Sequence, residues 1–368
     1  MKRYKLMIPG PVDVPDEVLQ AMIARSLPHY GDDWMEIYGE TLQALHKVFG
    51  TQGDLFIMPG PGSAASEAAL NSMLAPGEKV LLPVSGFFSE RLGRIARACG
   101  SEVIVLETTW GEPVQPERVA EALERDHEIK AVALIHHETS TGVLNPLREI
   151  AQVTHEHGLP IIVDGISSIG GVPLPVDEWG IEVCISVANK CLEAAPGLGM
   201  ISVNERAWQV MDAKKDKIHG WYLNLNVWRE YSHDWDWHPY PTTVPTHLIM
   251  GLHASLQGIL AEGLEARYAR YQRTADKVRA GLREMGFEML VAPEYACPLI
   301  TAMKGRPGVA LDALSRFLRD EHGILVAGGI GPLRGQILRV GHMGRALTDE
   351  YSQAFLTAVE DFLKRNPS

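Results

Sequence analysis

Short apolar runs alternate with helical patterns from about residue 50 to residue 205, and this alternation constrains the fold more than any other feature. The apolar runs are 54–58, 79–84, 102–106, 131–135 and 159–164, and the helical patterns are 63–74, 90–99, 116–124 and 147–157. Strands of a parallel sheet are covered on both faces and therefore consist of nearly continuous apolar residues. A repeating strand–helix order also favours parallel pairing. We predict an α/β fold with a mostly parallel sheet flanked by helices.

The rest of the chain departs from this rhythm. Residues 207–245 are rich in Trp and Tyr, and we expect an ordered excursion because aromatic side chains need a surface that buries them. A long helix is predicted over 247–285 with a break near Gly263, followed by strands and helices on a smaller scale. We therefore predict two domains: a large one at 20–255 and a smaller α+β one at 256–368, which also takes up residues 1–19.

Composition narrows the possible partners. The formal net charge of -12 argues against nucleic acid, because phosphate binding needs clustered Lys and Arg. No apolar run approaches the length of about 20 residues that a membrane span needs. The N-terminal segment lacks the apolar region of a signal peptide, and the four cysteines have no metal-ligand spacing. We expect a cytoplasmic protein that binds small molecules rather than nucleic acid, membrane or metal.

Asp164 and Lys190 are the strongest candidates for a reactive site. Asp164 ends the run 159–164, and Lys190 follows the next apolar run, 181–187. The carboxyl ends of parallel strands are where ligands bind in such sheets. A lysine can form a Schiff base with the aldehyde of pyridoxal 5'-phosphate (PLP), and a buried Asp can hold the pyridine nitrogen protonated. Because Asp and Lys at strand ends are also common surface residues, the pair alone leaves a plain structural role open.

A glycine-rich loop, 60–65, lies between a predicted strand and a predicted helix. Glycine allows close approach of the backbone, and a helix N-terminus offers free N–H groups to a phosphate. The loop also matches the G-x-G-x-x-A pattern of dinucleotide-binding proteins. Pro61 stiffens it, however, and a nicotinamide-dependent dehydrogenase would leave Lys190 unexplained. We interpret the loop as a phosphate cup, with a plain turn as the alternative.

Further candidates follow other strand ends. Thr139 and Ser140 could donate hydrogen bonds to a ring oxygen of the cofactor, and Phe88 could stack on a flat ring or simply pack in the core. His136 and His137 are adjacent, so their side chains point to opposite sides of a strand and do not suit a metal site. Arg339 lies in an apolar strand of the small domain, where it needs an anionic partner, either a substrate carboxylate or an internal one.

Taken together, these stretches resemble the class V, fold-type I PLP-dependent aminotransferases of the alanine–glyoxylate, serine–glyoxylate and serine–pyruvate group. The resemblance extends over nearly the whole chain. It rests on the opening 9–11, the loop 60–65, the stretches 138–146, 163–171 and 190–197, and the strand around Arg339.

The resemblance implies a role for each matching residue. Lys190 is the Schiff-base lysine and Asp164 pairs with the pyridine nitrogen. The residues implied to bind the cofactor are Gly62, Ser63, Phe88, Thr139, Ser140, Asn189, Tyr240 and Thr243. Phe88 stands where the family usually has Trp or Tyr, and Asn189 where many members have Gln. Tyr240 and Thr243 match a segment that reaches the partner's phosphate, which implies a homodimer with shared active sites, and Arg339 would bind the substrate carboxylate.

The implied reaction moves an amino group from a small amino acid, alanine or serine, to glyoxylate or pyruvate. Asn189-Lys190-Cys191 and the His pair also resemble the 2-aminoethylphosphonate–pyruvate and pyridoxamine–pyruvate aminotransferases, which stay open as alternatives. Cysteine desulfurases share this fold but typically carry His before the lysine. Cys297, beside Pro298, has no context that would stabilise a thiolate. A non-enzymatic binding protein on this fold would not need to retain both Lys190 and Asp164.

Overall fold

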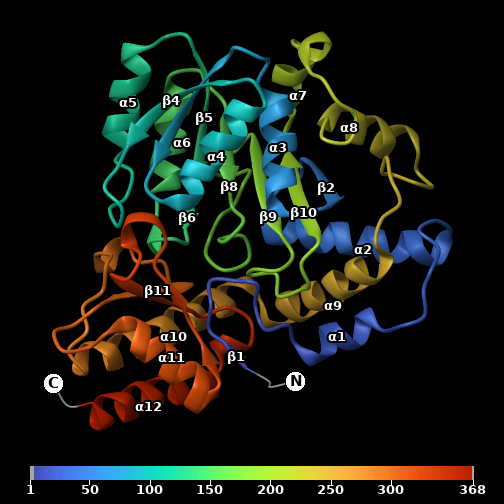
Figure 1. The fold of residues 1–368 in the computed structure, drawn as a ribbon. Helices are drawn as coiled ribbons and strands as arrows, with labels where there is room; N and C mark the ends of the chain where they lie inside the picture. Colours follow the sequence, from blue (N-terminus) through green and yellow to red (C-terminus); the bar gives the residue numbers. More distant parts are fainter. Residues whose placement is uncertain (1–3, 367–368) are drawn as a thin grey trace.

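The computed structural model describes residues 4–366; residues 1–3 and 367–368, which the predicted domain ranges include, lie outside it. A seven-stranded sheet with the order β2-β10-β9-β8-β5-β3-β4 forms its centre (Figure 1). The strands are β2 (Asp54–Pro59), β3 (Lys79–Val84), β4 (Glu102–Glu107), β5 (Ile129–Ile135), β8 (Ile161–Asp164), β9 (Val183–Val187) and β10 (Leu198–Val203). In this sheet only β10 runs antiparallel to its neighbours. The predicted parallel strands are confirmed, whereas β10 was not predicted.

Helices connect these strands and cover both faces of the sheet. They are α3 (Gly62–Met73), α4 (Phe87–Ala98), α5 (Pro116–Arg125) and α6 (Leu147–Glu156). From β2 through β3 to β4 the chain moves one way across the sheet, and from β4 through β5 to β8 it returns. Since crossovers between parallel strands are right-handed, α3 and α4 lie on one face and α5 and α6 on the other. The members of each pair contact each other, which confirms the predicted α/β architecture.

The aromatic excursion is ordered, as predicted. It contains α7 (Glu205–Asp212), the 3-10 helix η1 (Lys215–Lys217) and α8 (Leu225–Asp234). Trp208 and Trp228 pack against Phe56 of β2, with ring centroids 6.1 and 6.2 Å apart. Three other tryptophans of the segment, Trp221, Trp235 and Trp237, are exposed by 52, 41 and 56%. Burial within this chain therefore explains why Trp208 and Trp228 occur in this segment, but it does not explain the three exposed tryptophans.

The chain forms a second hydrophobic core, whose helices and strands lie below the large sheet in Figure 1. The predicted helix over 247–285 is two helices, α9 (Thr246–Glu262) and α10 (Leu264–Glu284), which meet at Gly263 with φ of 82°. The core is built around α10, α11 (Leu311–His322), α12 (Asp349–Arg365) and an antiparallel sheet of β11 (Ile300–Lys304), β14 (Ile337–Gly341) and β13 (Ala327–Gly328). Within residues 4–366, no helix has the length and apolar character needed to cross a bilayer.

The remaining elements are short or lie at the edge of the large sheet. They are β1 (Lys5–Leu6), α1 (Asp16–Met22), α2 (Asp32–Phe49), β6 (His137–Glu138), β7 (Val143–Leu144), β12 (Ile324–Leu325), and the 3-10 helices η2 (Pro293–Tyr295), η3 (Gly331–Leu333) and η4 (Arg345–Leu347).

The N-terminal segment joins the second core. β1 pairs in parallel with β12. The N–H of Met7 donates to Leu325 O at 2.9 Å, the Met7 carbonyl accepts from Gly341 N at 2.9 Å, and the Met7 side chain is fully buried. The chain then turns toward the large sheet, so that residues 9–11 cross the junction between the two cores.

Candidate active site

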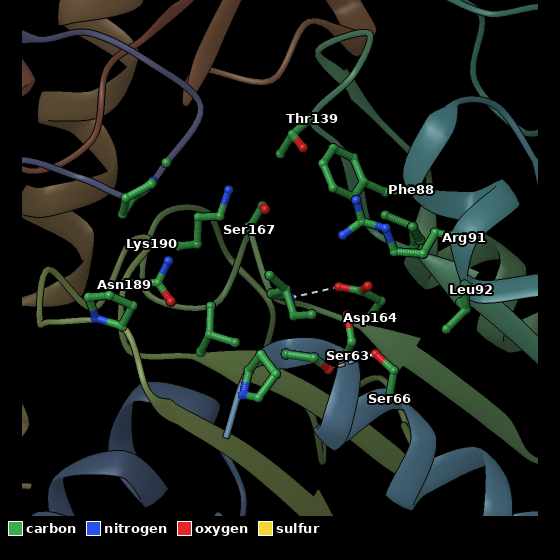
Figure 2. A pocket seen from close by; sticks show the side chains of 18 of the residues that line it. Ser63, Ser66, Phe88, Arg91, Leu92, Thr139, Asp164, Ser167, Asn189 and Lys190 are labelled. Atoms are coloured by element: carbon green, nitrogen blue, oxygen red, sulfur yellow. Dashed lines mark hydrogen bonds between the residues drawn. The ribbon is translucent and has the colours of Figure 1, made fainter. Parts of the chain in front are cut away.

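A cavity of about 590 Å³ opens at the carboxyl ends of β2, β9, β8 and β5 (Figure 2). Seven of the predicted site residues line it: Gly62, Ser63, Phe88, Thr139, Asp164, Asn189 and Lys190. The other four, Ser140, Tyr240, Thr243 and Arg339, do not line it. Residues far apart in the sequence meet here because parallel strands end at the same edge of the sheet.

Asp164 and Lys190 face this cavity from neighbouring strand ends. Asp164 closes β8, and its Oδ1 accepts a hydrogen bond from Ile166 N at 2.9 Å. Burial raises the pKa of Asp164 to about 7. Lys190 follows β9, and its Nζ donates to the carbonyl of Pro9. Burial lowers the pKa of Lys190 to about 8, and the nearby Arg339 contributes in the same direction. A lysine of this kind is partly neutral near pH 7, which is what a nucleophilic or proton-moving amine requires.

The loop at residues 9–10 lies against the Lys190 amine and leaves little room for a side chain at Gly10. A Cβ atom at Gly10 would lie 2.6 Å from Lys190 Nζ, and Gly10 has φ of 113°, which disfavours other residues. The loop at 9–10 therefore shapes the space around the amine. This contribution was not visible in the sequence, because the loop arrives from the other core.

The start of α3 offers an anion site. The backbone N–H groups of Gly62 and Ser63 donate to no acceptor within residues 4–366, and both residues line the cavity. A Cβ atom at Gly62 would lie 2.7 Å from Ile166 Cδ1 and 2.9 Å from Val187 Cγ1, so a larger residue there would require these side chains to move. Free N–H groups at the first turn of a helix bind phosphate well, because the helix dipole adds to the hydrogen bonds.

Thr139 and Ser140 point in different directions. Ser140 Oγ donates to Glu138 Oε1 at 2.6 Å and accepts from Phe87 N at 3.0 Å, which engages its hydroxyl away from the cavity. The side chain of Thr139 lies at the cavity beside Phe88 (Figure 2). Of the two predicted hydroxyls, that of Thr139 is thus placed to reach a bound ring.

Helix α4 begins at Phe87, three residues before the predicted start at 90. The difference arises because Glu138 and Ser140, from a distant turn, accept from the N–H groups of its first residues. Ser89 of the first turn accepts locally from Gly86 N at 3.0 Å, but Gly86 has no side chain for the N–H groups of the residues that follow it, so their acceptors on the distant turn could not be predicted locally.

The structure adds cavity residues that the sequence analysis did not identify. Arg91 lies one turn after Phe88 with its guanidinium 4.8 Å from the centre of the Phe88 ring. Ile166 lines the cavity two residues after Asp164. For Arg91, the only signal in the sequence is its helical spacing from Phe88. For Ile166, the only signal is its position just after the strand end at Asp164.

The two adjacent histidines point to opposite sides, as predicted. The His136 ring packs edge-on to Trp179 with centroids 6.0 Å apart. His137 lines the cavity, and its Nδ1 lies 3.1 Å from Ser167 O. Burial lowers the pKa of His137 to about 4, so the ring is neutral at physiological pH and Nδ1 carries the hydrogen. Its Nε2 has no hydrogen-bond partner within residues 4–366 and is a bare acceptor.

Arg339 stands beside the cavity rather than in its wall. It pairs with Ala302 and Ala327 in the small sheet. Its Nε donates to Gly328 O at 3.0 Å and its Nη1 to Thr139 O at 3.0 Å. Burial lowers the pKa of Arg339 to about 10, so the side chain is still protonated near pH 7. No acceptor for Nη2 is found within residues 4–366, so this nitrogen is available to an anion.

Tyr240 and Thr243 lie outside the cavity of their own chain. Tyr240 is buried, its hydroxyl accepts from Trp34 Nε1 at 2.7 Å, and it donates to the carbonyl of His29. Thr243 is exposed. Their predicted role in the site of a partner chain stays a prediction.

The cavity fits PLP in the chemistry of its lining. Two unpaired N–H groups and the Ser63 hydroxyl suit the phosphate, the Asp164 carboxylate suits the ring nitrogen, and the Lys190 amine suits the aldehyde. Phe88 and Ile166 both line the cavity and offer apolar surface to a flat ring. These features together are difficult to reconcile with the dehydrogenase alternative.

Comparisons with known proteins agree with this chemistry. The family model "Aminotransferase class-V" matches residues 16–340. An uncharacterized aminotransferase of Methanocaldococcus jannaschii is 39% identical over 92% of this chain and 87% of its own. A serine–glyoxylate aminotransferase of Methylorubrum extorquens is 32% identical over 93% of this chain and 87% of its own. The crystal structure of ureidoglycine–glyoxylate aminotransferase from Bacillus subtilis superposes with a TM-score of 0.95 at 30% identity, covering 100% of this chain and 95% of that one.

The match to the family model extends from α1 to the Arg339 strand, so it includes the cavity lining apart from Gly10 and Pro11 and the first hydrophobic core, whereas α12 of the second core lies beyond it. Solved aminotransferases similar to this chain have the fold-type I architecture seen here, which binds PLP. The chain therefore belongs to the class V aminotransferases and is a PLP-dependent transaminase.

Proposed function

We propose that the enzyme transfers an amino group from a small amino acid, alanine or serine, to glyoxylate or pyruvate, with Lys190 as the residue that holds the cofactor covalently. The observation that carries the proposal is the meeting of Asp164 and Lys190 in one cavity with the free N–H groups of Gly62 and Ser63. The names of similar proteins, which include a serine–glyoxylate aminotransferase, support the choice of substrates.

When bound, PLP supplies an aldehyde and an electron-withdrawing ring that acidifies the substrate Cα–H bond. Asp164 would keep the ring nitrogen protonated, because a carboxylate in a buried site favours a neighbouring positive charge. With the cofactor bound, the Lys190 amine would be the group that takes up the proton from Cα. Thr139 would donate to the ring oxygen, and Asn189, which also lines the cavity, would contribute a further contact to the cofactor.

Arg339 binds the substrate carboxylate in this proposal. Its Nη2 is free of partners within residues 4–366, and its other two nitrogens are held by backbone carbonyls of Gly328 and Thr139. A guanidinium held in this way is oriented before the substrate arrives, which reduces the entropy lost on binding. A small α-amino acid would then lie between Arg339 and Lys190.

The two alternative reactions differ from this one in the anion that they need. An enzyme for free pyridoxamine has no phosphate to bind, whereas the free N–H groups of Gly62 and Ser63 favour a phosphorylated cofactor. A substrate such as 2-aminoethylphosphonate would bring a phosphonate in place of the α-carboxylate. Arg339 suits either anion, so the choice of donor is left to experiment.

A homodimer with shared sites completes the proposal. The exposed rings of Trp221, Trp235 and Trp237 lie near Tyr240 in sequence, and so much exposed aromatic surface is unusual on an isolated subunit. Thr243, which is exposed, would reach the phosphate of the partner from this surface, whereas the hydroxyl of the buried Tyr240 is engaged by Trp34 and His29 of its own chain.

Single-turnover spectroscopy tests the function. The purified enzyme is mixed with L-alanine, L-serine or 2-aminoethylphosphonate, and the visible absorbance of bound PLP is followed. We expect alanine or serine to bleach the band and glyoxylate or pyruvate to restore it. Bleaching by 2-aminoethylphosphonate alone, or turnover of free pyridoxamine with pyruvate by a protein that holds no PLP, would replace the proposed reaction with the matching alternative.

The lowered pKa of Lys190 predicts a pH dependence. Only the neutral amine attacks an aldehyde, and the neutral fraction grows as pH rises toward the pKa of about 8. The rate at which PLP becomes attached to the apoenzyme should therefore increase roughly tenfold from pH 6 to pH 7 and level off above about pH 8. Stopped-flow absorbance measures this rate. A rate that keeps rising to pH 10 would mean that the amine has an ordinary pKa.

Replacing Arg339 by lysine is expected to raise KM for the amino donor by about tenfold or more, because a lysine amine cannot keep the bonds to Gly328 O and Thr139 O while it also offers a separate nitrogen to the substrate. Steady-state kinetics with the preferred donor measures the effect. Arg279 supplies a matched control, since it is also a buried arginine bonded to backbone carbonyls, those of Cys297 and Ile300, but lies outside the cavity. An R279K variant that raises KM as much as R339K would argue against substrate binding by Arg339.

A further inference from the structure

The carboxylate of Glu138 is fully buried and is surrounded by hydrogen-bond donors. Its Oε1 accepts from Ser140 N at 3.1 Å, from Ser140 Oγ at 2.6 Å and from Phe88 N at 3.3 Å. Its Oε2 accepts from Ser89 N at 2.9 Å, and Ser89 Oγ lies 3.1 Å away. Both oxygens thus accept from backbone N–H groups, and they do so from two segments about fifty residues apart.

These bonds cap the first turn of α4 from a distance. The residue at the N-cap is Gly86, which has no side chain to satisfy the free N–H groups. Glu138 accepts from two of them, and Ser140 Oγ accepts from a third, that of Phe87. A negative charge at a helix N-terminus is also favoured by the helix dipole. A Cβ atom at Gly86 would lie 2.5 Å from Glu138 Cδ, so the glycine makes room for the carboxylate.

The same carboxylate is linked to three residues that face or border the cavity. Phe88 lies in the capped turn, and Thr139 lies between Glu138 and Ser140 in the chain. The carbonyl of Thr139 in turn accepts from Arg339 Nη1 at 3.0 Å. Figure 2 shows Phe88 and Thr139 next to each other at one end of the cavity. Glu138 itself does not line the cavity.

We propose that Glu138 is a positioning residue of the active site: by fixing the backbone of Phe88 and Thr139, it sets where the aromatic ring and the hydroxyl meet the cofactor. The inference rests on the cofactor placement proposed above. The rest of α4 is held independently, because Leu92 and Ala96 are buried in the main core. Loss of the carboxylate should therefore loosen the first turn of α4 while the helix and the sheet stay folded.

Glu138→Gln is the direct test. The amide keeps the shape but replaces one acceptor oxygen by a donor, which then faces backbone N–H groups. We expect the Kd of the apoenzyme for PLP, measured by quenching of tryptophan fluorescence, to rise about tenfold or more. The induced circular dichroism of bound PLP should also weaken, because the ring is held less rigidly.

Glu182→Gln is the matched control. Glu182 is equally buried and accepts from Ile161 N at 2.7 Å and from Arg206 Nη1 at 2.9 Å, but it lies at the opposite end of β8 from Asp164. This variant should lower the melting temperature of the apoenzyme while its Kd for PLP stays within about twofold of wild type. Equal weakening of PLP binding in both variants, or wild-type Kd and dichroism in E138Q, would overturn the proposal.

Ser140→Ala provides a milder second variant if E138Q does not fold. It removes the hydroxyl between Glu138 and Phe87 N and should raise the Kd about threefold. An unchanged Kd in S140A would then count against the proposal. Borohydride treatment of the wild-type enzyme separates a failure of the proposed function from a failure of the proposal for Glu138. If it failed to fix PLP on Lys190, the proposed function would fail, whereas the comparison of E138Q with E182Q would still decide the role of Glu138.

Discussion

Lys190→Ala is expected to reduce transamination by roughly three to four orders of magnitude, because it removes both the covalent attachment of PLP and the amine that moves the proton. The fold should survive. The amine donates only to the Pro9 carbonyl within residues 4–366, and its burial carries a cost of desolvation that alanine removes. Activity with alanine and glyoxylate, together with the melting temperature of the apoenzyme, measures the two effects.

Lys214→Ala is a suitable control for this experiment. Lys214 is also largely buried, and its Nζ bonds Glu78 Oε2 at 2.6 Å and Met73 O at 3.0 Å, outside the cavity. The Lys214→Ala variant should be somewhat less stable than the wild type and should keep the visible absorbance band of bound PLP. Full activity in the Lys190 variant would show that another residue carries the reaction.

Asp164→Asn is the second substitution with a large expected effect. The amide has the same shape but no charge, so the protonated form of the ring nitrogen loses its partner and the ring withdraws electrons less well. We expect kcat to fall roughly a thousandfold, which is the scale of losing one buried electrostatic contact in a transition state. KM should change much less, because Asp164 does not contact the amino donor. Steady-state kinetics separates kcat from KM.

Without PLP, the same substitution should increase the thermal stability of the protein, although it lowers the activity of the enzyme with PLP bound. The pKa of Asp164 is raised to about 7 by burial, so the folded apoenzyme favours its protonated form. The stability associated with this group is therefore present at low pH and is lost as pH rises from about 4 through 7. Asn carries no such penalty, and the Asp164→Asn apoenzyme should melt at a higher temperature than wild type at pH 8. Equal melting temperatures there would mean that the carboxylate is well solvated.

Most of the large sheet could be predicted from the sequence for a physical reason. Strands covered on both faces leave continuous apolar runs, and the runs at 79–84 and 131–135 correspond closely to β3 and β5. β10 was harder to identify because its run, 198–203, directly follows a loop without an intervening helix. Its antiparallel direction depends on pairing with β2 and β9, which no local pattern records.

The candidate site was predictable in outline and less so in detail. Placement at strand ends brought Asp164 and Lys190 together because parallel strands share one edge. The choice between Thr139 and Ser140 could not be made, since either hydroxyl suits the ring and the decision is made by a bond from Ser140 to the buried Glu138. Arg91 is an ordinary exposed helix residue by pattern, and only the packing of α4 places it at the cavity.

The pairing of β1 with β12 has a consequence for synthesis of the enzyme. The loop that touches the Lys190 amine is anchored through Met7 to Leu325 and Gly341, which are made long after residue 190. During synthesis, the strands of the large sheet and Lys190 are complete before β12 and Gly341, to which the N-terminal segment is bonded, have been made. A nascent chain stalled before residue 324 would therefore lack the anchor that holds residues 9–10 against the Lys190 amine.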